Sequence, residues 1–236
     1  MKDKALAPII TNKNTLSFIP AKESKFFIHF FTIYTRWLLY WRFKAVWVKQ
    51  EYYPDSQARS VYFMNHTLWW DALLPLYLNH GYFKQKARAM MEEKQMREYK
   101  FFSKIGAFSI SLNDSRSQIR SLRYALDSMK RPKASLYLFP EGELSPASAY
   151  KPKFKDGLSW LYKQCDDVDF VPIVFYTHTF RGSKPELYIN IGERITIPNN
   201  IPTSDITLHL ETIVQQLLID TCEVAGFTDT GFTKMI

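Results

Sequence analysis

His66 and Asp71 stand five residues apart in a short polar and aromatic segment, residues 65–71 (NHTLWWD). An imidazole on a loop and a carboxylate in the first turn of a following helix lie close enough to share a hydrogen bond. The carboxylate then fixes the tautomer of the imidazole, and the other ring nitrogen can take a proton from a hydroxyl group. The pair predicts a general base, although this spacing alone also arises by chance in a chain with five histidines.

A second candidate segment, residues 139–146 (FPEGELSP), directly follows an apolar run. Pro140 and Gly142 favour a turn there, at the carboxyl end of a strand. Open α/β sheets place their ligands at that edge. Glu141, which lies between the two turn residues, is therefore expected to belong to a ligand site.

Together these segments resemble the glycerolipid (lysophospholipid) acyltransferase family, in which Asn-His-x4-Asp is followed later in the chain by Phe-Pro-Glu-Gly. Two further family blocks and a common companion element fit in the same order. They are residues 106–108 (GAF), 154–157 (FKDG) and 171–174 (VPIV). The resemblance covers residues 60–195 and is specific because the blocks agree in order and spacing.

The resemblance implies direct transfer of an acyl group, without an acyl-enzyme, from acyl-CoA or acyl carrier protein to a hydroxyl of a lipid. His66 would be the general base and Asp71 its orienting partner. Glu141 and Gly142 would line the acceptor site, with the carboxylate accepting hydrogen bonds from acceptor hydroxyls. The alternative for Glu141 is a carboxylate that only stabilises its loop.

Other site residues follow from the same resemblance. Asn65 would order the His66 turn through its amide, or be a plain turn residue. Lys155, in the FKDG element, is counted among the substrate-binding residues. Backbone N–H groups near His66 are the expected source of oxyanion stabilisation. No metal and no cofactor are expected beyond the acyl thioester co-substrate.

Departures from the family bear on the acceptor. Relatives that act on phosphorylated glycerol usually carry an arginine at the position of Leu112. They also carry a Thr-Arg pair at the positions of Glu143 and Leu144. Either the acceptor lacks a phosphate there, or basic residues on the next helix replace these arginines: Arg116, Arg120 and Arg123, at i, i+4 and i+7. A solvated helix face is the alternative for this basic stripe.

Two rival functions remain open. The first keeps the fold and changes the acceptor to a non-phosphorylated one, such as a glycolipid or a carotenoid alcohol. The second is a noncatalytic lipid-binding protein on the same fold, which the intact His66, Asp71 and Glu141 disfavour.

Composition points to a membrane surface. The net charge of +8 and the pI of about 9.3 favour an anionic partner. An aromatic content of 16% with six tryptophans favours lipid, while dispersed basic residues without a recognition motif argue against nucleic acid. Two cysteines are too few for a disulfide framework, and residues 1–20 lack the apolar core of a signal peptide. We therefore expect a peripheral or monotopic protein on the cytoplasmic face of a membrane.

Residues 26–43 form the most apolar stretch, but Arg36 sits well inside it, and an arginine at the centre of a spanning helix is costly. A helix here would carry one polar stripe, formed by Lys25, His29, Thr32 and Arg36. The rest of its surface would be covered by Phe27, Phe30, Phe31, Tyr34, Trp37, Leu38 and Trp41. This pattern predicts a helix that lies in the headgroup plane, and the alternative is a helix packed on the protein's own core.

Patterning of the remaining chain predicts a single α/β domain, with a mixed, mostly parallel sheet flanked by helices. Residues 1–50 would be an N-terminal extension with the interfacial helix, and residues 51–236 the acyltransferase domain. Expected strands are 61–64, 87–91, 107–112, 134–139, 170–176 and, at an edge, 186–191. Expected helices are 71–78, 92–105, 116–130 (with Ile119, Leu122, Leu126 and Met129 inward), 156–164 and 205–224.

Overall fold

The structure is a computed structural model that describes residues 18–145, 151–179, 182–198, 200–227 and 230–236. The prediction that residues 1–20 contain no signal peptide falls almost entirely outside these ranges. None of the helices in the described ranges is both long enough and apolar enough to cross a membrane.

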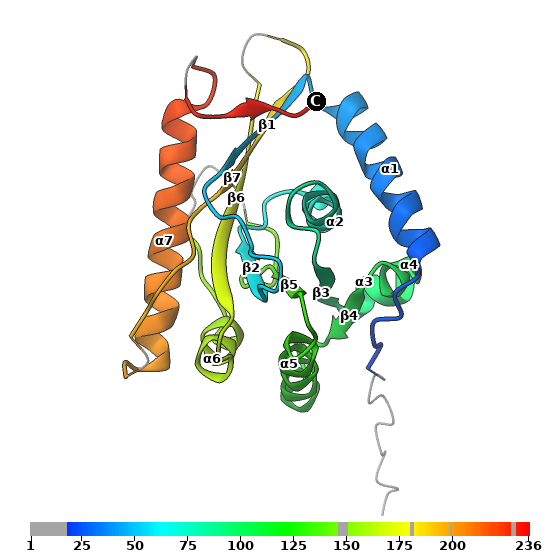
Figure 1. The fold of residues 1–236 in the computed structure, drawn as a ribbon, viewed down its shortest axis with the longest axis vertical. Helices are drawn as coiled ribbons and strands as arrows, with labels where there is room; N and C mark the ends of the chain where they lie inside the picture. The colour runs from blue at the N-terminus through cyan, green and yellow to red at the C-terminus, as the bar shows by residue number, and fades with distance from the viewer. Residues whose placement is uncertain (1–17, 146–150, 180–181, 199, 228–229) are drawn as a thin grey trace, which may run out of the picture.

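Strands and helices alternate along most of the chain (Figure 1). The strands are β1 (Ala45–Gln50), β2 (Ser60–Met64), β3 (Lys86–Glu92), β4 (Ala107–Ile110), β5 (Ala134–Leu138), β6 (Asp169–His178), β7 (Glu186–Ile191) and β8 (Thr233–Lys234). The α-helices are α1 (Lys25–Arg42), α2 (Leu74–Leu78), α3 (Glu93–Glu98), α4 (Phe101–Lys104), α5 (Ser115–Met129), α6 (Gly157–Gln164) and α7 (Thr203–Val224). A 3-10 turn, Trp69–Ala72, precedes α2, and a π-helical turn, Asn79–Phe83, follows it.

These strands form one sheet in the order β4-β3-β5-β2-β6-β7-β1-β8. From β4 to β6 every neighbouring pair is parallel, whereas β7 runs antiparallel to β6 and β8 antiparallel to β1. The predicted fold, a single domain with a mixed, mostly parallel sheet flanked by helices, is confirmed. Parallel pairing brings the carboxyl ends of β2, β3, β4 and β5 to one edge.

Both faces of the sheet are covered, and β2 shows why its sequence is apolar throughout. Tyr62 and Met64 point into a core that includes α2 and the end of α1, while Val61 and Phe63 point into a second core with α5, α6 and α7. All five residues of β2 are buried. Because a strand's side chains alternate between faces, a strand buried on both sides carries no polar alternation.

The position of β7 differs from the prediction. Residues 186–191 were expected to form an edge strand, but β7 lies inside the sheet, between β6 and β1. Its outer neighbour, β1, was missed because its residues follow the aromatic helix and read as part of the N-terminal extension. The division between an N-terminal extension (residues 1–50) and the acyltransferase domain stays a prediction. However, β1, which lies within residues 1–50, is a strand of the same sheet.

The expected helix over residues 92–105 is two short helices, α3 and α4. Tyr99, at φ −115° and ψ 78°, leaves the helical region and ends α3. The inward face of α5 differs from the prediction at one residue, because Ile119 is 51% exposed. Leu122, Leu126 and Met129 face the core as predicted, and several small side chains are buried beside them. Ser121 donates to the backbone oxygen of Ser109 at 2.8 Å, so this side of α5 approaches β4 closely.

Helix α1 packs on α2 and α4 with only one of its faces. Thr32, predicted to lie on an exposed polar stripe, is buried because that side of the helix faces the protein, and its hydroxyl bonds the Ile28 carbonyl. Phe31, predicted to face lipid, stacks on Phe101 at 4.2 Å between ring centroids. The opposite face presents a band of exposed apolar side chains, formed by Phe26, Phe30, Ile33, Tyr34, Trp37, Tyr40 and Trp41.

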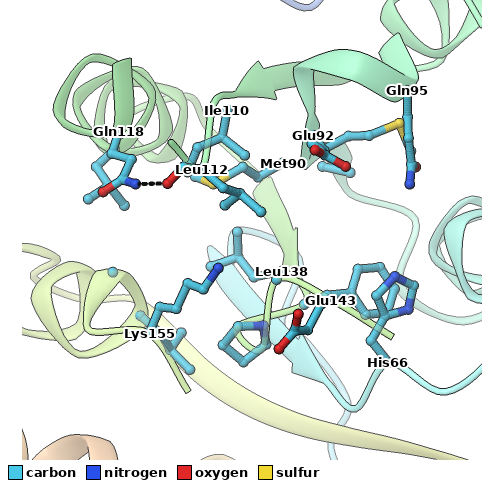
Figure 2. Close-up of a pocket in the computed structure, with 18 of the residues that line it drawn as sticks. His66, Met90, Glu92, Gln95, Ile110, Leu112, Gln118, Leu138, Glu143 and Lys155 are labelled. Carbon is cyan, nitrogen blue, oxygen red and sulfur yellow. Dashed lines mark hydrogen bonds between the residues drawn. The ribbon is translucent and has the colours of Figure 1, made fainter. Parts of the chain in front are cut away.

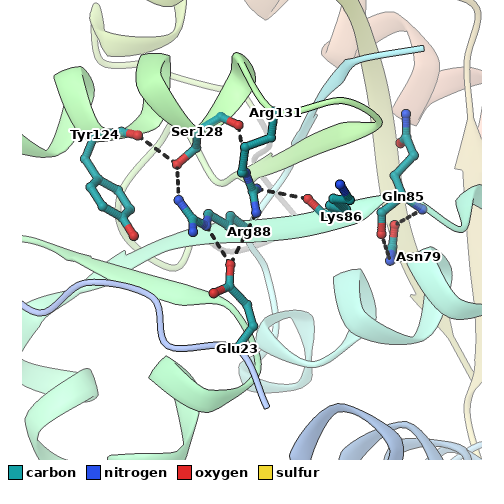
Figure 3. Close-up of polar contacts among 8 residues, drawn as sticks. All are labelled: Glu23, Asn79, Gln85, Lys86, Arg88, Tyr124, Ser128 and Arg131. Carbon is teal, nitrogen blue, oxygen red and sulfur yellow. Dashed lines mark hydrogen bonds and ion pairs between the residues drawn. The ribbon is translucent and has the colours of Figure 1, made fainter. Parts of the chain in front are cut away.

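The segment before α1 runs along the β4 edge of the sheet. Backbone bonds join Ser109 to Ile19 at 2.9 Å and Lys22 to Ser103 at 2.8 Å. The Glu23 carboxylate accepts a hydrogen bond from Arg88 at 2.7 Å and lies 3.3 Å from a nitrogen of Arg131 (Figure 3). These contacts hold the start of α1 against the sheet.

Candidate active site

His66 lies two residues beyond the end of β2, at the edge where the parallel strands end. The neighbouring strand β5 ends at Leu138, and Phe139 follows with its ring centroid 4.4 Å from that of His66. The two motif segments, far apart in sequence, therefore meet because β2 and β5 are adjacent and parallel. This position agrees with the general location of ligand sites in open α/β sheets.

The His66 ring is paired with Asp71 as the motif predicts. Its Nδ1 lies 3.2 Å from Asp71 Oδ2, with the His66 side chain 20% exposed and the Asp71 side chain fully buried. A carboxylate partner makes Nδ1 the hydrogen-bond donor, so Nε2 of the neutral ring is the unprotonated nitrogen. His66 is one of the residues that line a cavity.

Asp71 also organises the backbone of the turn. Its Oδ2 accepts hydrogen bonds from the backbone N–H groups of Thr67 and Leu68, each at 2.8 Å. Its Oδ1 is buried and has no hydrogen-bond partner among the described residues. Backbone N–H groups near His66 were expected to stabilise an oxyanion. The N–H groups of Thr67 and Leu68 do not support this expectation, because both already donate to the Asp71 carboxylate.

Glu141 contacts His66 through the backbone. Its Oε1 accepts from the His66 N–H at 3.1 Å, and the side chain is buried, outside the lining of the cavity. Three residues after Gly142, the Ser145 N–H donates to the His66 carbonyl at 2.8 Å. The contact of Glu141 thus corresponds to the alternative of a loop-stabilising carboxylate, here one that also holds the His66 turn.

Asn65 is tied to strand β6. Its side-chain oxygen accepts from the Phe175 N–H at 2.8 Å, and its side-chain nitrogen donates to the Phe175 carbonyl at 2.9 Å. The residue is fully buried. It therefore orders the His66 turn by joining it to the sheet, and it does not line the cavity.

A cavity of about 1390 Å³ opens beside His66, between β3, β4 and α5 on one side and the loops that follow β2 and β5 on the other (Figure 2). Much of its lining is apolar, including Met90, Ile110, Leu112, Leu122, Leu138, Phe154, Leu158 and Leu161. Gln118 donates to the Leu112 carbonyl at 2.6 Å and closes one end. A space of this size and lining suits a long apolar ligand.

Gly142 and Lys155 meet in the wall of the cavity. Gly142 has φ +75°, and a Cβ there would lie 2.8 Å from the Lys155 ammonium nitrogen, so a larger residue is disfavoured both by the backbone and by the neighbour. In contrast, Arg116 and Arg120 lie outside the lining, and Arg120 is placed over the Phe18 ring, 5.4 Å from its centroid. Only Arg123 of the predicted basic stripe reaches the cavity.

Several lining residues were not predicted. Glu92, Gln95 and Glu143 lie toward the same end of the cavity as His66 (Figure 2). Glu143 stands within the motif segment, and Glu92 ends β3, so a search of strand ends could have found both. Among the described residues no group of three or more His, Cys, Asp or Glu side chains is placed to hold a metal ion.

Comparisons with known proteins show the family and support the fold. The family model described as Acyltransferase matches residues 44–176, more than half of the chain. No curated protein matches the chain. Among solved structures, the 1-acyl-sn-glycerophosphate acyltransferase PlsC from Thermotoga maritima is similar, with a TM-score of 0.57 and 19% identity over 80% of this chain and 77% of that one. At this identity the likeness shows the fold.

Proposed function

This chain belongs to the acyltransferase family, and from that premise we propose that it transfers a fatty acyl group from acyl-CoA or acyl carrier protein to a hydroxyl group of a lipid. The observation that carries the proposal is the His66–Asp71 pair, 3.2 Å apart, at the wall of a large apolar cavity. A lipid acceptor agrees with the description of the similar Thermotoga protein as a 1-acyl-sn-glycerophosphate acyltransferase.

In the proposed reaction His66 is the general base. Its Nε2 takes the proton of the acceptor hydroxyl while the hydroxyl oxygen attacks the thioester carbonyl carbon. Collapse of the tetrahedral intermediate breaks the carbon–sulfur bond, and the imidazolium returns the proton to the leaving thiolate. The products are an ester and a free thiol, and no acyl-enzyme forms.

Neighbouring residues position this base. The buried Asp71 carboxylate fixes the tautomer of His66 and stabilises the imidazolium. Glu141 joins the His66 backbone to the loop after β5. Asn65 joins the same turn to β6. The apolar part of the cavity lining would bind the acyl chain, and Gly142 and Lys155 also lie in the cavity wall.

We further propose that the enzyme works at a membrane surface, on which the apolar band of α1 rests. Seven exposed apolar side chains share that face, which is more than a solvated helix normally presents. A cation adjoins the band, because Lys184 lies 5.7 Å from the Trp41 ring centroid. Lys104 lies 4.4 Å from the ring centroid of Phe27, which is next to Phe26 of the band. Aromatic side chains beside cations suit an anionic lipid interface on the cytoplasmic side.

The test of the catalytic proposal is His66→Ala, assayed with palmitoyl-CoA and a panel of lipid alcohols by thiol release and by ester formation. Loss of the base should lower kcat about 10²- to 10⁴-fold. His209→Ala, an exposed histidine on α7, is the matched control and should leave the rate unchanged. A folded His66→Ala protein with full activity would exclude this mechanism.

A further inference from the structure

Charge is unevenly distributed over the cavity. Its described lining contains four carboxylates and two permanent cations, namely Glu92, Glu98, Glu143, Asp156, Arg123 and Lys155. Glu92 and Glu143 lie toward His66 (Figure 2), and the Lys155 ammonium group lies beside Gly142, the residue before Glu143. Carboxylates thus outnumber cations in the cavity lining.

Glu143 is held close to His66 by the chain itself. The residues two before and two after it, Glu141 and Ser145, both bond the backbone of His66, at 3.1 Å and 2.8 Å. Since consecutive Cα atoms are about 3.8 Å apart, the Glu143 Cα lies within about 7.6 Å of both of these residues. Its side chain lines the cavity from this loop.

Glu92 reaches the same edge from β3. In the parallel pairing of β3 with β5, Ala89 is opposite Tyr137, which puts Met91 level with Phe139. The Phe139 ring is the one that lies 4.4 Å from the His66 ring. Glu92 follows directly and lines the cavity.

Neither carboxylate forms a salt bridge in the part of the chain that the structure describes. Lys155 is the nearby cation, since its ammonium group lies beside Gly142. An anionic group bound beside His66 would therefore meet two like charges and one opposite charge, which gives it no net attraction. Hydroxyl groups, in contrast, can donate hydrogen bonds to carboxylates.

We propose that Glu92 and Glu143 are specificity-determining residues that select a lipid acceptor with free hydroxyl groups, and no phosphate, next to the reacting hydroxyl. This inference rests on the proposed function and names its acceptor class. Gln95, at the same end of the cavity, offers both a donor and an acceptor to such a head group.

The test compares two acceptors that differ in one group: 1-oleoylglycerol and 1-oleoyl-lysophosphatidate, each at low mole fraction in neutral detergent micelles with palmitoyl-CoA. Both carry the same secondary hydroxyl, and only the second has a phosphate on the neighbouring carbon. Wild-type enzyme should show a higher kcat/KM for 1-oleoylglycerol. Glu92→Gln with Glu143→Gln should shift the ratio toward lysophosphatidate by about tenfold or more, because removing like charges removes the repulsion.

Glu223→Gln, an exposed site near the end of α7, controls for the change in net charge and should leave the ratio unchanged. A second measurement needs no variant: added salt should reduce the wild-type preference, since screening weakens repulsion between partly exposed charges.

The outcomes separate the two proposals. A wild-type preference for lysophosphatidate, or a ratio that responds neither to the Gln substitutions nor to salt, overturns the acceptor inference and leaves acyl transfer intact. Failure to release thiol with either acceptor or with any other lipid alcohol contradicts the proposed function, and the acceptor inference falls with it.

Discussion

At the scale of single residues, the site is a set of carboxylates with different tasks around one imidazole. Asp71 contacts the ring, Glu141 contacts the backbone of the same residue, and Glu143 faces the cavity. All three side chains are carboxylates, so only their contacts distinguish their tasks. Asp71 orients the imidazole, Glu141 positions the backbone, and Glu143 faces the space for substrate. Each task predicts a different response to substitution.

Asp71→Asn should lower kcat about 10²- to 10⁴-fold with little change in KM. The amide keeps the size of the side chain and one acceptor oxygen for the Thr67 and Leu68 N–H groups, but it no longer enforces the productive tautomer of His66. Steady-state kinetics beside thermal unfolding would measure both effects. Asp127→Asn, an exposed carboxylate on α5, is the control. A normal kcat in Asp71→Asn would show that the pair is structural.

Glu141 should behave as a positioning residue. Glu141→Gln retains an oxygen that can accept from the His66 N–H, whereas Glu141→Ala leaves this buried donor without its partner. We expect the Gln variant to keep most of the wild-type kcat, and the Ala variant to lose kcat and about 1 to 3 kcal/mol of stability. If both variants instead raise KM for the acceptor equally, Glu141 binds substrate directly.

At the scale of elements, the parallel strands β2, β5 and β3 bring distant segments of the chain to one edge. The segment before α1 adds a second kind of connection, because Glu23 links it to Arg88 on β3 and to Arg131 after α5 (Figure 3). Burial opposes ionisation of Glu23, but hydrogen bonding to Arg88 and the charges of both arginines outweigh it. The pKa of the Glu23 carboxyl is therefore lowered from its ordinary value of 4.5.

This lowered pKa predicts a pH-dependent contribution to stability. A carboxyl whose pKa is lower in the folded state stabilises the fold fully above 4.5, the value of the unfolded chain, and loses that contribution as the pH falls through the folded pKa. Glu23→Gln should lower the free energy of unfolding by about 0.5 to 1 kcal/mol at neutral pH. The difference from wild type should vanish in acid, as thermal unfolding across this range would show. A deficit independent of pH would contradict the assignment.

At the scale of the whole molecule, the protein has two accessible apolar surfaces. One is the apolar part of the cavity lining at the strand edge, and the other is the exposed band of α1. The net charge of +8 supplies attraction to an anionic surface over a longer range than either contact. A surface enzyme of this kind would take its acceptor from the bilayer on which it rests.

Membrane binding can therefore be tested separately from folding. Phe30→Ser, Trp37→Ser and Trp41→Ser together should weaken binding to phosphatidylglycerol vesicles about a hundredfold or more, since each aromatic ring loses apolar burial. Phe31→Ser, on the inward face against Phe101, should instead lower the unfolding temperature and retain vesicle binding. Cosedimentation and thermal unfolding distinguish these outcomes. Wild-type binding should weaken with salt but persist in part; undiminished binding by the triple variant would exclude α1 as the contact.

The sequence by itself determined the features that depend on local pattern and on motif chemistry. The apolar runs of β2, β5 and β6 predicted buried strands, the aromatic periodicity predicted α1, and the order of the motif blocks predicted the acyltransferase fold. The His66–Asp71 contact was also within reach, because the two residues are only five positions apart in one turn.

Tertiary structure decided everything that depends on which distant segments become neighbours. β1 pairs with β7, and Arg116 and Arg120 lie away from the cavity that Arg123 reaches. Glu92 lies at the same edge of the sheet as His66 because β3 pairs in parallel with β5. Local patterning fixes which face of an element is apolar, but pairing between remote strands follows from the packing of the whole chain, and no short stretch of sequence contains that information.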